Sequence, residues 1–238
     1  MREFTPLDGA LLVDKPEGWT SHDVVAKVRN HFRIPKVGHC GTLDPMATGL
    51  LILVFGQATR LSESLMATDK VYEGVMRLGE STDSHDADGE LTGSMLVPPL
   101  TLEELNTTAK GFEGDQHQVP PMVSAVKIGG VPLHKLARKG QEVERQPRLV
   151  HIYSYKFHDY EEPFAYFEVA CTKGTYIRVL AHDLGNLLGC GAHLTRLRRL
   201  SSGRFDVEEA STLETILKWN QAELEKHVIP YLKLKQPG

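Results

Sequence analysis

The chain has 238 residues, long enough for one large domain or two small ones. It is 41% hydrophobic and 24% charged, as in an ordinary globular protein, and no apolar run approaches the ~20 residues that cross a membrane. The N-terminus has no apolar signal segment, and Cys40, Cys171 and Cys190 lie far apart, without disulfide-framework or zinc spacing. Together these features exclude a membrane or disulfide-stabilised secreted class and predict a cytoplasmic location.

The charge distribution says more than the formal net charge of −4. Basic residues gather in two segments, 193–204 and 127–148, whose cations are Arg196, Arg198, Arg199 and Arg204 in the first and Lys127, Lys135, Arg138, Lys139, Arg145 and Arg148 in the second. Segregated basic surface is what a phosphate-tracking face requires. A solvated surface helix explains each segment equally well.

Apolar spacing predicts the elements in chain order. Strands are expected at 10–14, 50–55, 70–78, 149–157 and 165–171, and helices from Thr20 or Ser21 to about 32, at 58–66, at 102–112, from Gly174 to about 188 and beyond 211. Strands and helices alternate without a regular period, which favours a mixed α/β (α+β) sheet over a doubly wound parallel one. Residues 116–148 are rich in proline, glycine and basic residues, which predicts an ordered, projecting insertion.

One loop, Gly38 to Gly49, combines three glycines, His39 and Asp44 between two apolar segments. Glycine allows the close approaches of a shaped loop, and the proline after Asp44 favours an extended backbone there. This arrangement can present a carboxylate to a substrate. Asp44 as an N-cap with proline at the first helical position is the commonplace alternative.

The run GHCGTLDPMATGLL resembles the catalytic motif of the TruB family of tRNA pseudouridine synthases. Further blocks resemble that family in the same order: LLVDKPEGWTSHDVV, KVYEGVMRLGESTDSHDADG, VPPMVSAVKIGGVPLHKLARKG, CTKGTYIRVLAHDLG and CGAHLTRLRRLSSGRF. The resemblance implies the pseudouridine synthase fold, a mixed and largely antiparallel sheet with a central RNA-binding cleft and a thumb-like insertion at 116–148. It implies a catalytic domain over 1–205 and a short helical extension at 206–238 in place of the family's C-terminal RNA-binding domain. His134 stands in the insertion where the family usually has tyrosine.

The resemblance also implies the reaction, which is isomerisation of uridine 55 to pseudouridine in the T-loop of tRNA. Asp44 matches the catalytic aspartate, which either attacks covalently or removes a sugar proton. Arg178 matches the arginine that pairs with that aspartate, and Tyr72 matches the tyrosine that lies against the target base. Without the resemblance, Arg178 is a surface helix residue and Tyr72 an ordinary strand residue.

Five further residues match substrate-binding positions. Tyr176 and Leu197 would contact the flipped base, as aromatic and apolar walls suit. His39 would take the place that the base vacates, while Lys15 supports the site and Asp86 shapes its rim. Without the resemblance, a lone loop histidine such as His39 is more often structural than functional, and Leu197 is an ordinary core residue.

No cofactor is expected, because the reaction exchanges no electrons and loses no group. Asp83, Asp86, Asp88 and Gly89 do not have the ligand spacing of a calcium-binding loop, so no metal is expected either.

The predicted partner is the T-stem-loop of tRNA. The protein is expected to bind it as a monomer, without an obligate protein partner and without a membrane. Two rival hypotheses are a tRNA-folding factor that does not need Asp44 and an aspartate-dependent hydrolase of a small molecule.

Overall fold

The computed structural model describes residues 4–122, 124, 127–128, 131–132 and 143–236. The chain forms two compact units, unit 1 from residues 1–70 and 198–238 and unit 2 from residues 71–197. Along the chain, strands β4 and β12 run through the two junctions between the units. Part of the predicted thumb, including His134, lies outside the described residues.

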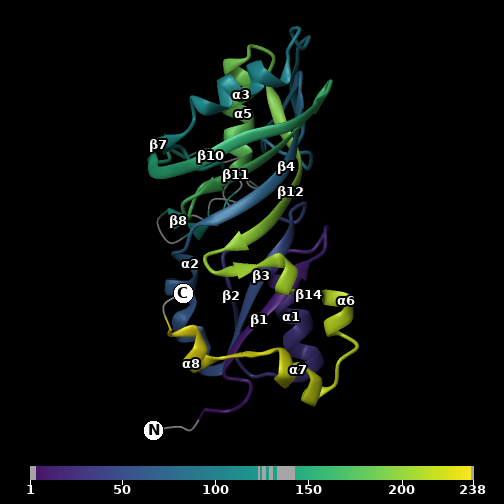
Figure 1. The fold of residues 1–238 in the computed structure, drawn as a ribbon, viewed down its shortest axis with the longest axis vertical. Helices are drawn as coiled ribbons and strands as arrows, with labels where there is room; N and C mark the ends of the chain where they lie inside the picture. The colour runs from purple at the N-terminus through teal and green to yellow at the C-terminus, as the bar shows by residue number, and fades with distance from the viewer. Residues whose placement is uncertain (1–3, 123, 125–126, 129–130, 133–142, 237–238) are drawn as a thin grey trace. The chain divides into compact units, whose positions relative to one another are not determined.

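Unit 1 is built on a mixed sheet in which β3 pairs antiparallel with β1 and β2 and parallel with the end of β12 (Figure 1). Its elements are β1 (Gly9–Lys15), α1 (Ser21–Phe32), β2 (Val37–Cys40), β3 (Thr48–Phe55), η1 (Gly56–Leu61), α2 (Ser62–Met66), β13 (Phe205–Asp206), η2 (Val207–Glu209), β14 (Ser211–Thr212), α6 (Leu213–Ile216), α7 (Gln221–His227), β15 (Ile229–Pro230) and α8 (Tyr231–Leu234). The strand order is β14–β1–β3–β12, with β15 on β1 and β13 on β12.

The core of unit 1 follows from continuous apolar strands, because residues 50–55 of β3 are all fully buried. One face of the sheet packs in a cluster of Ala10, Leu12, Cys40, Leu50, Ile52, Val54, Ala58, Leu65, Phe205 and Leu234. Helix α1 begins at a reciprocal capping box, in which Thr20 and Asp23 satisfy each other's backbone N–H groups. This cap fixes the start of α1 at Ser21, a few residues after the end of β1 at Lys15.

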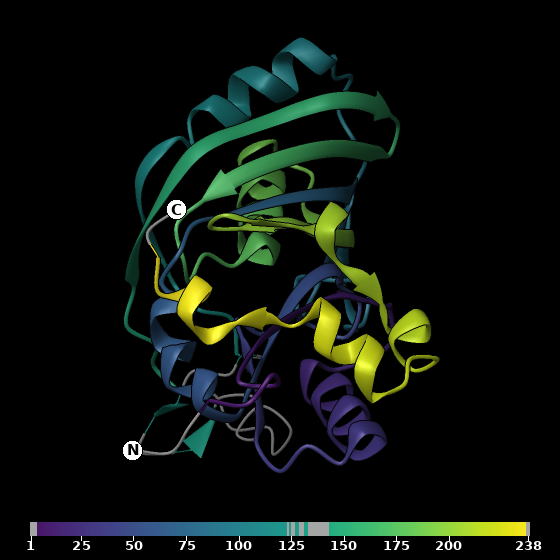
Figure 2. The ribbon, with the colours of Figure 1, turned by 60° about the horizontal axis from the view of Figure 1, so that its bottom comes forward.

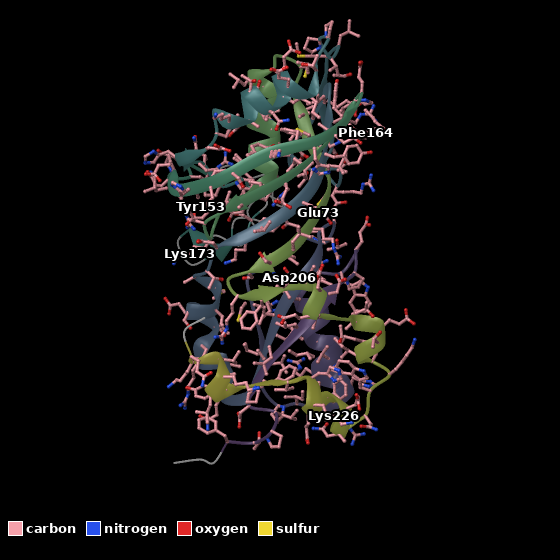
Figure 3. The ribbon with its side chains drawn as sticks, viewed as in Figure 1. Glu73, Tyr153, Phe164, Lys173, Asp206 and Lys226 are labelled. Atoms are coloured by element: carbon pink, nitrogen blue, oxygen red, sulfur yellow. The ribbon has the colours of Figure 1, made fainter. Side chains whose placement is uncertain are left out.

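Unit 2 has a sheet of strand order β12–β4–β11–β10–β7, in which β10 pairs antiparallel with both β11 and β7. Its elements are β4 (Lys70–Leu78), β5 (Glu80–Thr82), β6 (Leu91–Ser94), α3 (Leu102–Lys110), β7 (Gly114–Gln118), β8 (Lys127–Ile128), β9 (Val131–Pro132), β10 (Arg148–Glu161), β11 (Phe164–Cys171), α5 (Ile177–Leu187) and β12 (Ala192–Ser202). Tyr155, Phe157 and Phe167 form an aromatic centre with ring centroids 5.3–5.8 Å apart. Glu73 on β4 and Tyr153 on β10 are exposed strand residues of this unit (Figure 3).

Helix α3 lies along β10 (Figure 2), fixed by Asn106. The Asn106 amide donates to the Phe157 carbonyl at 2.9 Å and accepts from the Phe157 N–H at 2.9 Å. One side chain thereby satisfies both backbone groups of a buried strand residue.

The predicted mixed, largely antiparallel sheet is confirmed, as are the predicted long strands and α1. Segment 193–204 was expected to be surface, as a basic face or a solvated helix. The segment forms the strand β12 rather than a helix. Arg196 and Arg204 are exposed, as a basic face requires, whereas Arg199 is only 1% exposed. The helix expected from Gly174 begins later, at Ile177 with Tyr176 as N-cap, and the helix expected at 58–66 is a 3-10 turn followed by α2. Within the described residues, no helix is both long and apolar enough to span a bilayer.

Candidate active site

Asp44 opens a β-turn, with the Ala47 N–H donating to the Asp44 carbonyl at 3.1 Å. The helix start that the Asp-Pro pair allowed is therefore wrong, because β3 begins at Thr48. The Asp44 side chain is half-buried, so its carboxylate is partly open to a ligand. Gly49 ends the loop at φ +94°, and a Cβ there would stand 2.3 Å from the Arg199 carbonyl oxygen, so this position requires glycine.

Arg199 closes the base of this loop. Its Nε donates to the Leu50 carbonyl at 2.7 Å and its Nη2 to the Gly41 carbonyl at 3.1 Å. These two carbonyls flank the loop that carries Asp44. The Arg199 guanidinium thus binds the backbone of the loop, although the sequence suggested that it would face phosphates.

Ser21 and Lys15 hold the middle of the loop. Ser21 Oγ accepts from the Leu43 N–H at 2.9 Å and donates to the Leu43 carbonyl at 3.1 Å. The fully buried Lys15 Nζ donates to the carbonyls of Pro16 (2.9 Å), Trp19 (2.6 Å) and Pro45 (3.2 Å). All three ammonium protons of Lys15 can be used on backbone oxygens.

Burial lowers the pKa of Lys15 to about 8, while the nearby Asp44 carboxylate opposes this shift. The Lys15 ammonium group therefore interacts electrostatically with the Asp44 carboxylate.

His39, on β2, has an Nδ1 atom that is buried without a hydrogen-bond partner. Its ring makes an edge contact with the ring of His22, with the centroids 5.6 Å apart. Burial lowers the pKa of His39 to about 4, with the charges of His22 and Arg199 adding to the effect. His39 is consequently neutral at physiological pH.

In unit 2, Arg178 and Asp86 form a buried ion pair. The Arg178 Nη1 lies 2.9 Å from the Asp86 Oδ2 and also donates to the Ser84 carbonyl at 3.0 Å. The other carboxylate oxygen of Asp86 accepts from Ser84 Oγ at 2.5 Å and from the Asp88 N–H at 3.2 Å. A buried guanidinium needs such a partner, and this contact orients it.

Tyr176 is held at the N-cap of α5 by Gln118 of β7. Gln118 accepts from the Tyr176 N–H at 2.7 Å and donates to the Tyr176 carbonyl at 3.0 Å. Tyr72 on β4 and Leu197 on β12 are both 8% exposed. Each lies within two residues of a junction between the units along the chain.

The eight predicted site residues divide between the units: Asp44, His39 and Lys15 in unit 1, and Tyr72, Arg178, Tyr176, Leu197 and Asp86 in unit 2. The unit 1 residues share the Asp44 loop or its support, and Arg178 and Asp86 contact each other. The predicted pairing of Asp44 with Arg178 stays a prediction. Among the described residues, no cluster of three or more His, Cys, Asp or Glu side chains could hold a metal.

Sequence reasoning missed Ser21, Gln118 and the true environment of Arg199. Ser21 follows the N-cap of a helix and resembles any first-turn serine. Gln118 lies at the start of a segment assigned to an insertion. Only Arg199 carried a signal, because it lies two positions after apolar Leu197 and would therefore share its face of a strand.

Comparison with known proteins gives these residues a context. The family description "TruB family pseudouridylate synthase (N terminal domain)" matches residues 29–177, and "tRNA pseudouridylate synthase B C-terminal domain" matches residues 178–233. The tRNA pseudouridine synthase B of Opitutus terrae is 53% identical over 224 residues, covering 94% of this chain and 93% of the relative. That of Dechloromonas aromatica is 46% identical over 235 residues, covering 99% of this chain and 78% of the relative.

Solved structures agree with these relatives. A chain in the crystal structure of a Cbf5–Nop10–Gar1 complex is similar with a TM-score of 0.76 and 30% identity, over 96% of this chain and 61% of that chain. A chain of an H/ACA RNP bound to a substrate RNA containing 2′-deoxyuridine is similar with a TM-score of 0.72 and 27% identity, over 95% and 60%. Fold and relatives together define an isomerase, a pseudouridine synthase. Within that class, the chain belongs to the TruB family.

Proposed function

We propose that this protein converts uridine 55 in the T-loop of tRNA to pseudouridine. The relatives named tRNA pseudouridine synthase B support tRNA as the substrate. The observation that carries the catalytic assignment is the loop of Asp44, whose backbone is bonded by three buried side chains, Lys15, Ser21 and Arg199. The loop presents a half-buried Asp44 side chain in a fixed position, as a reacting group requires.

The reaction breaks the bond between uracil N1 and C1′, turns the base and joins C5 to C1′. Asp44 either attacks covalently or removes a sugar proton to form a glycal-like species. In both routes the uracil is detached within the pocket when N1–C1′ breaks and is joined to the RNA again through C5. The proton of C5 is then released to solvent and N1 gains a proton, so no base leaves the enzyme. Arg178 supplies the positive charge that keeps a carboxylate ionised, and Tyr72 lies against the base and assists proton transfer at C5.

The remaining residues act around the base. Tyr176 and Leu197 form aromatic and apolar walls of its pocket, and His39, neutral at physiological pH, fills the space in the RNA stack that the flipped base leaves. Lys15 and Asp86 act by holding groups in place rather than by contacting RNA, since their polar atoms bond to the Asp44 loop and to Arg178.

Tritium release from tRNA transcripts labelled at uracil C5 tests the proposal. The intact transcript should release tritium and a transcript with cytidine at position 55 should not. Asp44→Asn should abolish release while tRNA binding in a filter assay stays near that of the wild type. Equal release from both transcripts would place the reaction elsewhere, and an active Asp44→Asn variant would overturn the role of the carboxylate.

The same experiment separates the rival hypotheses. Binding without release by the wild type would indicate a tRNA-folding factor. Free labelled uracil in the supernatant would indicate a hydrolase.

A further inference from the structure

Two histidines that the reaction above does not use are stacked face to face in unit 2. His85 lies in residues 83–90, between β5 and β6, and His182 lies on α5. Their ring centroids are 3.8 Å apart, and the ring planes differ by 2°. No other aromatic pair in the described residues is so close and so nearly parallel.

His85 adopts a backbone conformation that few residues accept. Its φ is +64°, in the left-handed region, which costs a residue with a Cβ about 1 kcal/mol. Its N–H donates to the Thr82 carbonyl at 3.2 Å, and its carbonyl accepts from the Leu194 N–H at 3.0 Å. The surroundings of His85 therefore impose this conformation, which directs its ring onto α5.

The His85 ring is neutral at physiological pH, and the His182 ring accepts a hydrogen bond. The Asn186 amide nitrogen lies 2.9 Å from His182 Nε2 and can only donate, so that ring carries its proton on Nδ1. The facing charges are Arg178, Arg145 and Asp86. Burial lowers the pKa of His85 to about 4, with His182, Arg178 and Arg145 contributing and Asp86 opposing. A neutral His85 ring can stack on His182 at this distance without charge repulsion.

The stack is not a metal site. The Nδ1 atoms of both rings are buried without hydrogen-bond partners. Imidazole nitrogens bind a metal in the plane of the ring, and two parallel planes 3.8 Å apart cannot aim at one ion. The contact between the rings is consequently one of packing.

The position of the stack suggests what it does. His85 directly precedes Asp86, and His182 follows Arg178 by one helical turn on the same face of α5. Residues 83–90, here called the Asp86 loop, are therefore joined to α5 at two neighbouring points. These are the Asp86–Arg178 ion pair and the ring stack. We propose that the His85–His182 stack is a positioning pair, which fixes the Asp86 loop on α5 and thereby the orientation of the Arg178 guanidinium. This inference rests on the proposed function, which gives Arg178 its role.

Substitutions of His182 test the proposal, because alanine is well accepted in a helix. His182→Ala should lower kcat for tritium release by about tenfold, with KM within about twofold, since a displaced Arg178 affects the reacting state more than RNA binding. His182→Phe keeps a planar ring on His85 and should restore kcat to within about twofold of the wild type. Leu187→Ala, at a 67%-exposed position near the end of the same helix, is the matched control and should leave kcat unchanged.

His85→Gly separates positioning from stability. Glycine accepts φ +64° without strain, so this variant should unfold near the wild-type temperature while losing kcat as His182→Ala does. A wild-type kcat in His182→Ala or His85→Gly would overturn the proposal. So would a His182→Phe variant as slow as His182→Ala.

Amide hydrogen exchange of residues 83–90 supplies a readout that does not depend on activity. Exchange should quicken in His182→Ala and not in His182→Phe. A wild type that releases no tritium would overturn the proposed function, whereas exchange would still decide whether the stack holds the Asp86 loop. Unchanged exchange in His182→Ala would overturn the stack's role alone.

Discussion

The two units hold their candidate catalytic residues by different kinds of contact. In unit 1, Arg199, Ser21 and Lys15 bond to backbone atoms of the Asp44 loop. In unit 2, Arg178 is held through its own charged group, by Asp86 and the Ser84 carbonyl. The first arrangement fixes the backbone of the loop that carries Asp44, while the second fixes the charged group of Arg178 itself.

This difference determines which substitutions are costly. Removing one support of the Asp44 loop leaves neutral carbonyls unsatisfied, which costs about 1–3 kcal/mol for each group. Removing Asp86 takes an anion from a buried cation, which costs more. We therefore expect unit 2 to be the more sensitive to a single charge-removing change and unit 1 to lose activity with smaller losses of stability.

Asp86→Asn should show the largest effect. It removes the anion facing the 3%-exposed Arg178 side chain and should lower the free energy of unfolding by about 3–5 kcal/mol in urea titrations. Asp14→Asn is the matched control, since Asp14 pairs with Arg198 where the two side chains are 22% and 33% exposed. That variant should lose about 1 kcal/mol or less. Equal losses in the free energy of unfolding of the two variants would show that burial does not make the Asp86–Arg178 pair more costly to break than the Asp14–Arg198 pair.

Arg199→Met should rank second. Methionine fills similar space but leaves the Gly41 and Leu50 carbonyls without these donors, a loss of about 2–4 kcal/mol. Tritium release should fall further than the loss of folded protein explains, because the ends of the Asp44 loop are freed. Arg204→Met is the control, as Arg204 also bonds to two carbonyls but is exposed. Full activity in Arg199→Met would show that the loop does not need its closed base.

Ser21→Ala should rank third, with a loss of about 1–2 kcal/mol in the free energy of unfolding. The buried Ser21 hydroxyl serves both the N–H and the carbonyl of Leu43, so one oxygen atom fixes the residue before Asp44. Ser64→Ala removes an exposed hydroxyl that bonds to the Leu61 carbonyl and should change stability little. A Ser21→Ala variant as stable and active as Ser64→Ala would mean that this contact does not hold the loop.

The sequence predicted the continuous apolar strands and α1 well because their periodicity is local. The strand β12 was missed because Arg196, Arg198 and Arg199 interrupt a strict alternation of apolar and polar residues. Only the fold decides that Arg199 donates to the carbonyl of Leu50, 149 positions earlier in the chain. Such side chain to backbone contacts leave no spacing pattern in a sequence. The same holds for Gln118, which binds Tyr176 across 58 positions.

The site residues were predicted by motif, and the structure adds how they are held. Asp86 was expected at the rim of a pocket, and its buried pairing with Arg178 gives it a specific contact. The His85–His182 stack was outside any motif, because two histidines 97 positions apart have no spacing that predicts contact. Long-range polar contacts of this kind need coordinates.

The smallest expected effect concerns pH and again contrasts a neutral buried group with a charged one. His39 titrates near pH 6.5 when unfolded but has a pKa of about 4 in the native state, so the unfolded chain takes up a proton first as pH falls. The contribution of the neutral His39 ring to the free energy of unfolding is fully present above pH 6.5. It is lost progressively as the pH falls toward 4. Between pH 6.5 and 5, urea titrations of the wild type should therefore lose about 1 kcal/mol more than those of His39→Asn. If His39→Asn lost stability as steeply as the wild type, the buried Nδ1 of His39 would not be the group that resists protonation.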